Sequence, residues 1–352
     1  MKILLVRLRE IGDVVFTTPA LHALRSHVPD AHVTYVVEPT AAPVVQHNPH
    51  IDELLVVPRL RGVAGWRADV ACGRRLRARG YDVAIDFHGG PRASLLTWLS
   101  GAPRRIGYAV PGRAWMYTDR VARPRELRAR HSVENQWDLL APLGIGAPDR
   151  TAFPVEMSAD ASTAARVAER LLRAGIGAAD RIAVMHVSAG NPFRRWPLDH
   201  FVGVARALRD RLHCRVVVTS GPSERDAAAS VVAQSGAVEC GEFSLTELRA
   251  LLDRAALYIG GDSGPLHIAA TTRVPIVGLY GPTLPERSAP WRDPRLATLS
   301  IDAGALPCRP CDQRACAPGD FRCLTRIAPA DVIAAAERLL SASPQRPIAS
   351  SR

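Results

Sequence analysis

LYIGGDSGPLHIAA, residues 257–270, decides the fold class of this chain. An apolar strand runs into Gly-Gly-Asp-Ser-Gly, and a proline then opens a helix. Glycines let a backbone approach a ligand closely, and the N–H groups at a helix start bind phosphate oxygens. We therefore predict a phosphate-binding turn in an α/β domain, with a histidine in the first helical turn as a further donor. Its residues are Asp262, Ser263, Gly264, Pro265 and His267.

The alternative is an ordinary strand-to-helix turn, in which Asp262 or Ser263 caps the helix and His267 lies on the surface. A cap does not require the aspartate, the serine, the glycine and the histidine together, so the phosphate site is the stronger interpretation. The string is not a G-x-G-x-x-G motif directly after the first strand, which argues against a dehydrogenase.

Short apolar runs followed by amphipathic stretches extend along the whole chain, a rhythm typical of parallel α/β sheets. In the first half we expect strands at residues 2–7, 32–38, 53–58, 81–87 and 104–109. In the second half we expect them at 181–187, 214–221, 237–243, 257–262 and 274–281. The intervening helices include 19–28, 92–101 and 161–175.

A stretch rich in proline, alanine and polar residues, at 145–162, separates the two halves. We predict an N-terminal Rossmann-like domain at 1–155 and a C-terminal one at 156–328, whose parallel sheets face a central cleft. A last helix at 329–342 is expected to pack back toward the N-terminal domain. The tail at 343–352 is expected to be disordered.

Three further strings place reactive side chains at predicted strand ends. Asp13 lies in the predicted loop before the helix that Pro19 starts, where a carboxylate can take a proton from a hydroxyl, or can cap a turn. Arg194 and Arg195 follow a strand in FRRWP, where fixed cations can neutralise a leaving phosphate or lie in a solvated loop. Glu224 follows a Gly-Pro-Ser turn and can bind ribose hydroxyls or act as a helix-terminus charge.

The charge is strongly basic, and arginine carries almost all of it. The net charge is +11, and Lys2 is the only lysine. A compositional bias that places arginine where other proteins have lysine is one explanation. The other is an anionic partner: arginine clusters at 61–80 and 103–131 match no nucleic-acid module, so we expect an acidic acceptor or an anionic membrane surface, and no nucleic acid. The first apolar run is too short for a signal peptide, and no run is long enough to span a membrane. We therefore expect a cytoplasmic protein, at most peripheral to the inner membrane.

Four of the seven cysteines crowd into sixteen residues, with the spacing C-x2-C-x4-C-x6-C. They are Cys308, Cys311, Cys316 and Cys323. A structural zinc or iron–sulfur site, two disulfides and free thiols all remain open for this cluster.

The four strings around residues 13, 194, 224 and 262 together resemble glycosyltransferase family nine, the ADP-heptose:lipopolysaccharide heptosyltransferase family. The resemblance runs from residue 2 to about residue 340. It implies the GT-B architecture, with the acceptor on the N-terminal domain and the nucleotide sugar on the C-terminal domain. It also implies inversion at the anomeric carbon and catalysis without a metal cofactor.

Individual residues take family roles through this resemblance. Asp13 matches the catalytic base, and Glu224 matches the ribose-binding acid. Arg194 matches a phosphate-contacting position usually held by lysine, a departure that keeps the charge. The residues of 262–267 match the donor-pyrophosphate motif.

The resemblance implies an inverting enzyme that moves a heptose or related sugar from ADP-heptose to a hydroxyl of a lipopolysaccharide core precursor. The sequence adds one observation of its own: no two aspartates have the Asp-x-Asp spacing with which many metal-dependent transferases hold a divalent ion. The alternatives are a GT-B transferase or sugar-nucleotide epimerase that uses another nucleotide sugar, and a non-catalytic binding protein of the same fold.

Overall fold

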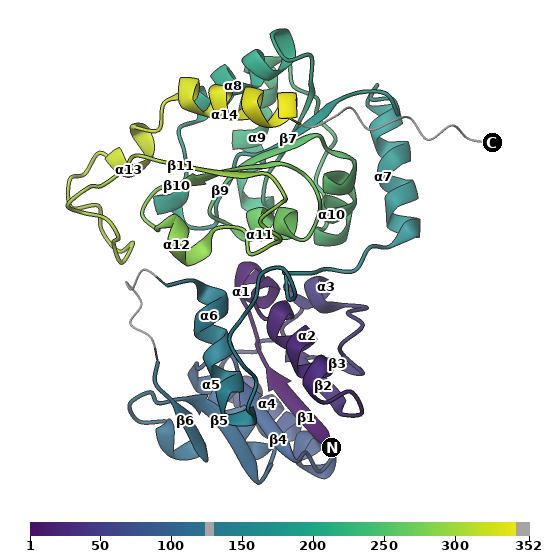
Figure 1. Ribbon diagram of the computed structural model, residues 1–352, viewed down its shortest axis with the longest axis vertical. Helices are drawn as coiled ribbons and strands as arrows, with labels where there is room; N and C mark the ends of the chain where they lie inside the picture. The colour runs from purple at the N-terminus through teal and green to yellow at the C-terminus, as the bar shows by residue number, and fades with distance from the viewer. Residues whose placement is uncertain (124–129, 343–352) are drawn as a thin grey trace. The chain divides into compact units, whose positions relative to one another are not determined.

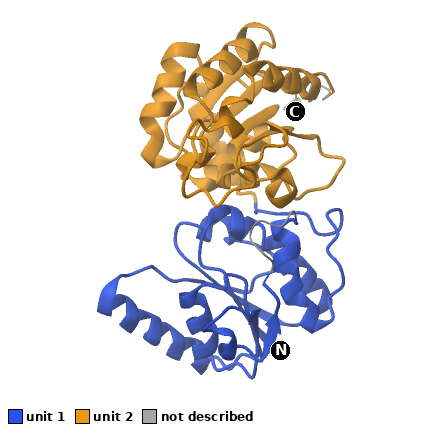
Figure 2. Cartoon of the chain, turned by 90° about the vertical axis from the view of Figure 1, so that its left-hand side faces the viewer, with its two compact units in different colours: residues 1–158 blue, residues 159–352 orange. Residues whose placement is uncertain are grey.

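The computed structural model describes residues 1–123 and 130–342, and the chain divides into two compact units. Unit 1 is Met1–Ser158 and unit 2 is Ala159–Arg352 (Figure 2). The sequence places this boundary three residues earlier, after residue 155. The predicted disordered tail at 343–352 lies outside the described residues.

Unit 1 contains a six-stranded parallel sheet in the order β3-β2-β1-β4-β5-β6. Its strands are β1 Lys2–Val6, β2 His32–Val37, β3 Glu53–Val56, β4 Val83–Asp86, β5 Arg104–Tyr108 and β6 Asp119–Val121. The central strand β1 is buried on both faces, which is why its sequence is a continuous apolar run and not an alternating one. Order reverses between β1 and β4, the usual ligand position of such sheets.

Helices connect these strands, and α4 packs against α5 (Figure 1). The α-helices are α1 Ile11–Val15, α2 Thr18–His27, α3 Ala42–Val45, α4 Gly62–Ala78, α5 Pro91–Leu99 and α6 Ser132–Trp137. Two 3-10 helices are η1 Ala114–Met116 and η2 Asp138–Leu143.

Unit 2 contains a five-stranded parallel sheet in the order β11-β10-β9-β7-β8. Its strands are β7 Ile182–His186, β8 Arg215–Thr219, β9 Leu257–Gly261, β10 Ile276–Tyr280 and β11 Thr298–Asp302. Its α-helices are α7 Ala161–Arg173, α8 Leu198–Asp210, α9 Arg225–Ser235, α10 Leu245–Arg254, α11 Gly264–Ala270, α12 Pro285–Ser288, α13 Arg322–Thr325 and α14 Pro329–Ala342. Two 3-10 helices are η3 Pro192–Arg194 and η4 Pro222–Glu224. Here the order reverses between β7 and β9.

The last helix, α14, belongs to the core of unit 2. It packs against α8 and contacts β9, β10 and β11, with Val332, Ala336 and Leu340 buried in that core (Figure 1). The apolar face of α14 is therefore buried within unit 2, whereas the sequence predicts that this helix packs toward the N-terminal domain. The apolar spacing of 332–340 indicates a buried face but not its partner.

The strand predictions need three corrections. Residues 237–243 form a single β-bridge, between Val238 and Val217, and not a strand. The edge strands β6 and β11 are not predicted from the sequence, because partly exposed edges lack a continuous apolar run.

No described helix combines the length and apolar character needed to cross a membrane.

Candidate functional site

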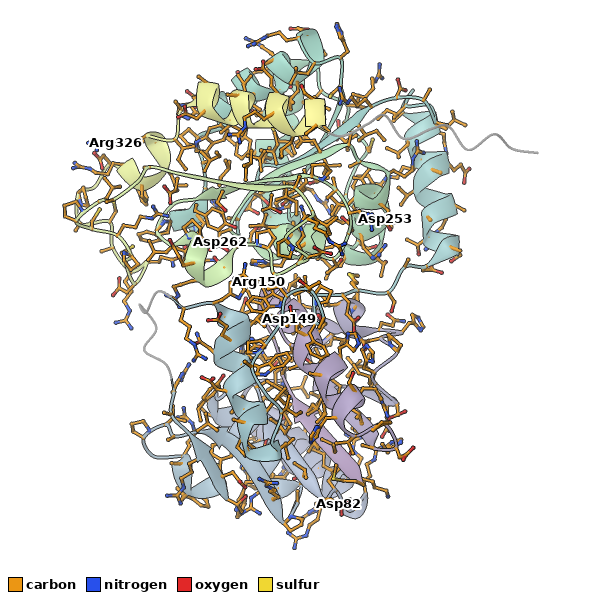
Figure 3. All side chains as sticks on the ribbon, viewed as in Figure 1. Asp82, Asp149, Arg150, Asp253, Asp262 and Arg326 are labelled. Atoms are coloured by element: carbon orange, nitrogen blue, oxygen red, sulfur yellow. The ribbon has the colours of Figure 1, made fainter. Side chains whose placement is uncertain are left out.

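The predicted phosphate turn lies at the strand-order reversal of unit 2. Asp262 follows β9 directly, and Ser188 to Arg195 follow β7, the neighbouring strand. Because both strands are parallel, their carboxyl ends meet at the same edge of the sheet. Asp262 is labelled in Figure 3.

Asp262 is buried, and three donor groups converge on its carboxylate. Thr283 Oγ1 donates to Oδ2 over 2.5 Å, and Arg194 Nη1 lies 3.1 Å from the same oxygen. His267 Nε2 lies 3.5 Å from Oδ1. A carboxylate so enclosed cannot also accept phosphate, because two anions would repel each other. The geometry makes Asp262 the anchor of Arg194 and of the two neighbouring donors, His267 and Thr283.

The pKa of Asp262 reflects this enclosure. Burial raises its pKa, but the hydrogen bond from His267, the charge of Arg194 and the Thr283 hydroxyl outweigh burial and hold the pKa below its ordinary value. Asp262 is therefore ionised at neutral pH.

Arg194 is held on three sides. Its Nη1 donates to the Asp262 carbonyl at 3.1 Å, besides the ion pair with the carboxylate. Its Nε donates to Gln313 Oε1 at 2.8 Å, and Asn191 Nδ2 donates to the same oxygen at 2.8 Å. Nη2 has no partner among the described residues, and the side chain is 30% exposed. The guanidinium is thus fixed, with one nitrogen open to a ligand.

Helix α11 starts next to this cation. Ser263 is its N-cap in an extended conformation, but its hydroxyl bonds the Gly261 carbonyl at 3.3 Å and does not cap the helix. Pro265 lies in the first turn, as predicted from the sequence. Gly261 lies under the Arg194 carbonyl, where an added Cβ would approach to 3.2 Å. The glycine before the aspartate therefore permits close packing of the arginine loop.

His267 is buried on α11, with 6% of its side chain exposed. The sequence places it on the phosphates, but its Nε2 is directed at Asp262. Its position supports a role through the aspartate.

Arg195 and Glu224 form a second ion pair in this unit. Arg195 Nη2 lies 2.7 Å from Glu224 Oε1, and Arg195 Nε donates to the Ala189 carbonyl at 3.0 Å. Glu224 is buried in η4, and the turn before it is held by Ser188, whose Oγ accepts from Gly221 N at 2.8 Å. The consecutive residues Arg194 and Arg195 thus each pair with one of the predicted acids, Asp262 and Glu224.

Asp13 lies in unit 1, after β1 and next to the strand-order reversal. It is in the first turn of the short helix α1 and not in a loop, so the sequence prediction of its local structure is wrong. The sequence signal for a helix is weak over five residues. Arg7 forms an ion pair with Asp13 Oδ2 and donates from Nη1 to the Phe87 carbonyl at 2.7 Å.

The Asp13 side chain remains 38% exposed, whereas Arg7 is 10% exposed. Glu10, just before α1, has φ 61°, a strained backbone conformation for a residue with a side chain. The carboxylate is thus fixed from beneath by a buried cation and is open to solvent above. Such a group can receive a proton from an incoming hydroxyl.

Several arginines of 103–131 are engaged in local contacts. Arg104 pairs with Asp119 at 3.0 Å, and Arg105 donates to the Met116 carbonyl at 2.8 Å. Arg130 pairs with Asp138 at 2.5 Å. These three arginines are thus held within unit 1 and are not free to bind an acceptor, whereas Arg120 and Arg123 are exposed and have no ion pair among the described residues. Arg128 lies outside the described residues.

The four clustered cysteines line one pocket of unit 2, together with Phe193, Arg309 and Phe321. None of the chain's seven cysteines, all of which are described, is in a disulfide. Burial raises the pKa of the Cys323 thiol, and the three neighbouring thiols raise it further. Gln313, between Cys311 and Cys316, connects this loop to Arg194.

Within the described residues, one set of potential ligands meets the distance expected around a metal ion: His22, His50 and Glu156 in unit 1. The two imidazole rings are stacked, 13° apart, with centroids 4.4 Å apart. Their ring-nitrogen lone pairs therefore run side by side and do not converge, so this set is a packed His–Glu contact and not a preformed metal site.

Sequence reasoning missed Gln313, Thr283 and Arg7. Gln313 is 119 residues from Arg194, inside a segment that the cysteines dominate. Thr283 gives no signal, because a hydroxyl after a strand is common. Arg7, at the end of β1, could have been found, since it is a charged residue that directly follows a buried strand.

The family model of glycosyltransferase family 9 (heptosyltransferase) matches residues 70–317. "Lipopolysaccharide heptosyltransferase 3" of Escherichia coli is 29% identical over 343 residues, with 94% of this chain and 97% of the relative covered. The glycosyl transferase family 9 structure from Veillonella parvula has a TM-score of 0.84 and 27% identity, with 97% and 98% covered.

The Escherichia coli heptosyltransferase WaaC, solved with ADP-2-deoxy-2-fluoro heptose, has a TM-score of 0.68 and 21% identity, with 97% and 99% covered. At that identity the likeness shows the fold alone. The two parallel-sheet units have the GT-B architecture. The family model covers well over half of the chain, and this chain therefore belongs to glycosyltransferase family 9, the heptosyltransferase family.

Proposed function

We propose that this enzyme transfers a heptose from ADP-heptose to a hydroxyl of a lipopolysaccharide core precursor, with inversion at the anomeric carbon. The observation that carries the proposal is the fixed cation of unit 2, Arg194, held by Asp262 and Gln313 with one nitrogen free among the described residues. The names of the relatives supply the heptose and the lipopolysaccharide.

The donor diphosphate is proposed to bind at Arg194 Nη2 and at the start of α11. A guanidinium and the N–H groups of Gly264 and its neighbours present complementary positive charge to phosphate oxygens. As the bond to the sugar breaks, charge builds on the departing diphosphate, and groups that are already fixed stabilise it without reorganising. Asp262 and His267 act by keeping this constellation in place.

Glu224 is proposed to bind the ribose hydroxyls of the nucleotide. One of its oxygens is paired with Arg195, so the other, Oε2, is the acceptor for a hydroxyl. Arg195, 45% exposed, can reach a phosphate from its remaining amino group.

Asp13 is proposed as the general base. The acceptor hydroxyl loses its proton to the carboxylate and attacks the anomeric carbon in line with the departing nucleoside diphosphate. The new glycosidic bond forms as the bond to the diphosphate breaks, so the reaction is a single displacement. The Arg7 ion pair orients Asp13 for this step.

Catalysis is proposed to need no metal, because Arg194, Arg195 and the start of α11 supply the positive charge that a divalent ion supplies elsewhere. The test is turnover in excess EDTA, with the metal content of the purified protein measured beside it, since the cysteine cluster could hold a structural ion. Activity that EDTA abolishes and Mg²⁺ or Mn²⁺ restores would contradict metal independence.

The acceptor is proposed to be anionic, and the enzyme is proposed to meet it at the cytoplasmic face of the inner membrane, because the protein carries a net charge of +11.

One experiment tests the donor directly: thermal unfolding in the presence of a panel of sugar nucleotides. A ligand that binds only the folded state raises the melting temperature, and at equal concentration the tighter ligand raises it more, because the stabilisation grows with the logarithm of concentration over Kd. ADP-heptose should give the largest rise, and a larger rise with a UDP-sugar would replace the donor assignment.

A further inference from the structure

The segment from Pro58 to Arg67 contains the loop after β3 and the first turns of α4. It exposes large apolar side chains next to arginines. Leu60 is 52% exposed, Val63 68% and Trp66 62%. Residues 58–64, 66 and 67 are all exposed. Single exposed apolar residues are ordinary, but three within seven residues need a partner.

This segment is exposed but well anchored. Gly65 lies directly beneath the Leu60 carbonyl, where an added Cβ would approach to 2.5 Å. Arg92 Nη2 donates to the Pro58 carbonyl at 2.9 Å, and the same side chain pairs with Asp69 of α4 and with Glu38, each at 2.8 Å. The protein thus holds the apolar side chains outward on a fixed base.

The outward face of α4 continues the pattern. Residues 63, 67, 70, 74 and 77 follow three- and four-residue spacing and share one side of the helix, away from the buried Cys72 and Leu76. This side combines two valines with Arg67, Arg74 and Arg77.

The arginines of this face are available. Among the described residues, no carboxylate lies within ion-pair distance of a set of five arginines: Arg59, Arg61, Arg67, Arg74 and Arg77. They differ from Arg104 and Arg130, which pair with carboxylates, and from Arg105, whose side chain donates to the Met116 carbonyl. The one acidic residue between Pro58 and Arg77, Asp69, is neutralised by Arg92.

We propose that Pro58–Arg77 is a docking surface for an anionic phospholipid bilayer. Leu60, Val63 and Trp66 enter the interface between headgroups and acyl chains, where tryptophan is favoured. The arginines lie at headgroup level, with their stems along the apolar surface and their charges on lipid phosphates. This surface deepens the proposed function, because it brings the enzyme to a lipid-borne acceptor.

The test is flotation of the full chain with lipid vesicles, which does not depend on turnover. The protein should float with vesicles containing phosphatidylglycerol and should not float with pure phosphatidylcholine. Neutralising Arg67 and Arg74 to Gln should weaken binding about fivefold for each charge removed, since each basic residue near an anionic surface contributes about that factor. Replacing Leu60 and Trp66 with Ser should abolish flotation at physiological salt.

Matched controls keep the result specific. Trp115→Ser removes a tryptophan that is 57% exposed elsewhere on unit 1, and Arg173→Gln with Arg211→Gln removes two exposed charges from unit 2. Both controls should float like the wild type. Each variant should keep the wild-type melting temperature, because the changed side chains are exposed.

Insertion can be read separately with brominated phospholipids, which quench tryptophan fluorescence at the depth of the bromine. Quenching should occur in the wild type and largely disappear in Trp66→Phe. Flotation that the Leu60 and Trp66 substitutions leave unchanged would overturn the proposal, as would wild-type protein that does not float with anionic vesicles. Loss of self-association in these variants without any vesicle binding would assign the surface to a second copy of the chain. None of these outcomes bears on whether ADP-heptose is the donor.

Discussion

Gln313 offers the sharpest test of the donor site, because it is uncharged and contacts Arg194, the cation that is proposed to bind the diphosphate. Its Oε1 accepts 2.8 Å hydrogen bonds from Arg194 Nε and Asn191 Nδ2. Removing Arg194 should weaken ADP binding by roughly tenfold to a hundredfold, since hydrogen bonds to charged groups contribute about 1.5–3 kcal/mol. Gln313→Ala leaves the cation present but held by Asp262 alone, so we expect a smaller loss, about threefold, as for a typical net hydrogen bond of about 0.5–1 kcal/mol.

A double-mutant cycle separates positioning from independent binding. ADP affinity is measured by calorimetric titration in wild type, both single variants and the double variant. If Gln313 acts through Arg194, the double variant binds ADP no more weakly than Arg194→Ala alone. Additive losses, with the two fold-changes multiplying, would refute the reasoning, because Gln313 would then contact the nucleotide by itself.

The control for this cycle is Arg314→Ala, on the next residue of the same loop. Its side chain is 87% exposed and lies 3.7 Å from Asp312, away from the contacts of Arg194. This variant should bind ADP like the wild type. Equal losses in Arg314→Ala and Gln313→Ala would mean that any change in the loop disturbs the site. Melting temperatures of all variants show whether a loss of affinity reflects unfolding.

Three further predictions concern catalysis and stability. Asp13→Asn should keep ADP affinity and lower kcat by about 10²–10⁴-fold, the usual loss on removing a general base, and near wild-type kcat would exclude Asp13. His267→Ala should weaken ADP binding less than Arg194→Ala, since it acts through Asp262, and a larger loss would place the imidazole on the diphosphate. Burial lowers the pKa of His186 from 6.5 to about 4, so the folded state binds fewer protons than the unfolded state between these values. The contribution of the neutral imidazole to the free energy of unfolding is complete above pH 6.5 and falls by about 3 kcal/mol toward pH 4. Denaturant unfolding of His186→Gln across this range should lose this part of the pH dependence. An unchanged pH profile would exclude His186 as its source.

The sequence predicts the central strands of both sheets well, because a strand buried on both faces must be a continuous apolar run. β1 and β9 show this, since each is buried along almost its whole length. Edge strands escape this logic: β6 has partly exposed residues throughout, and its apolar content is too low to recognise. The reverse error occurs at 237–243, where residues of suitable composition follow a helix but find only one bridge partner.

The residues of the candidate site likewise fall into those that the sequence can predict and those that it cannot. Asp262, Arg194 and Glu224 are predictable because each follows a strand whose carboxyl end lies at the ligand edge of a parallel sheet. Gln313 is not, since its role depends on how the loop of 303–321 folds over the sheet edge, and no periodicity governs that loop. The structure also indicates a different role for Asp262 from the one that the sequence predicts. Its place in a phosphate motif suggests a ligand, whereas its burial among three donors indicates an anchor.

An anionic anchor inside a phosphate site has a physical rationale. A guanidinium fixed without a counter-charge in a partly buried site is costly, and a flexible one loses conformational entropy when the diphosphate binds. Asp262 addresses both costs, because its carboxylate neutralises Arg194 and its carbonyl accepts a second bond from the same nitrogen. The geometry leaves Nη2 without a partner among the described residues, so the site keeps a directed donor while the net local charge stays low. If a diphosphate binds here as proposed, its interaction with Nη2 adds to an already neutralised pair, and the site does not first have to assemble.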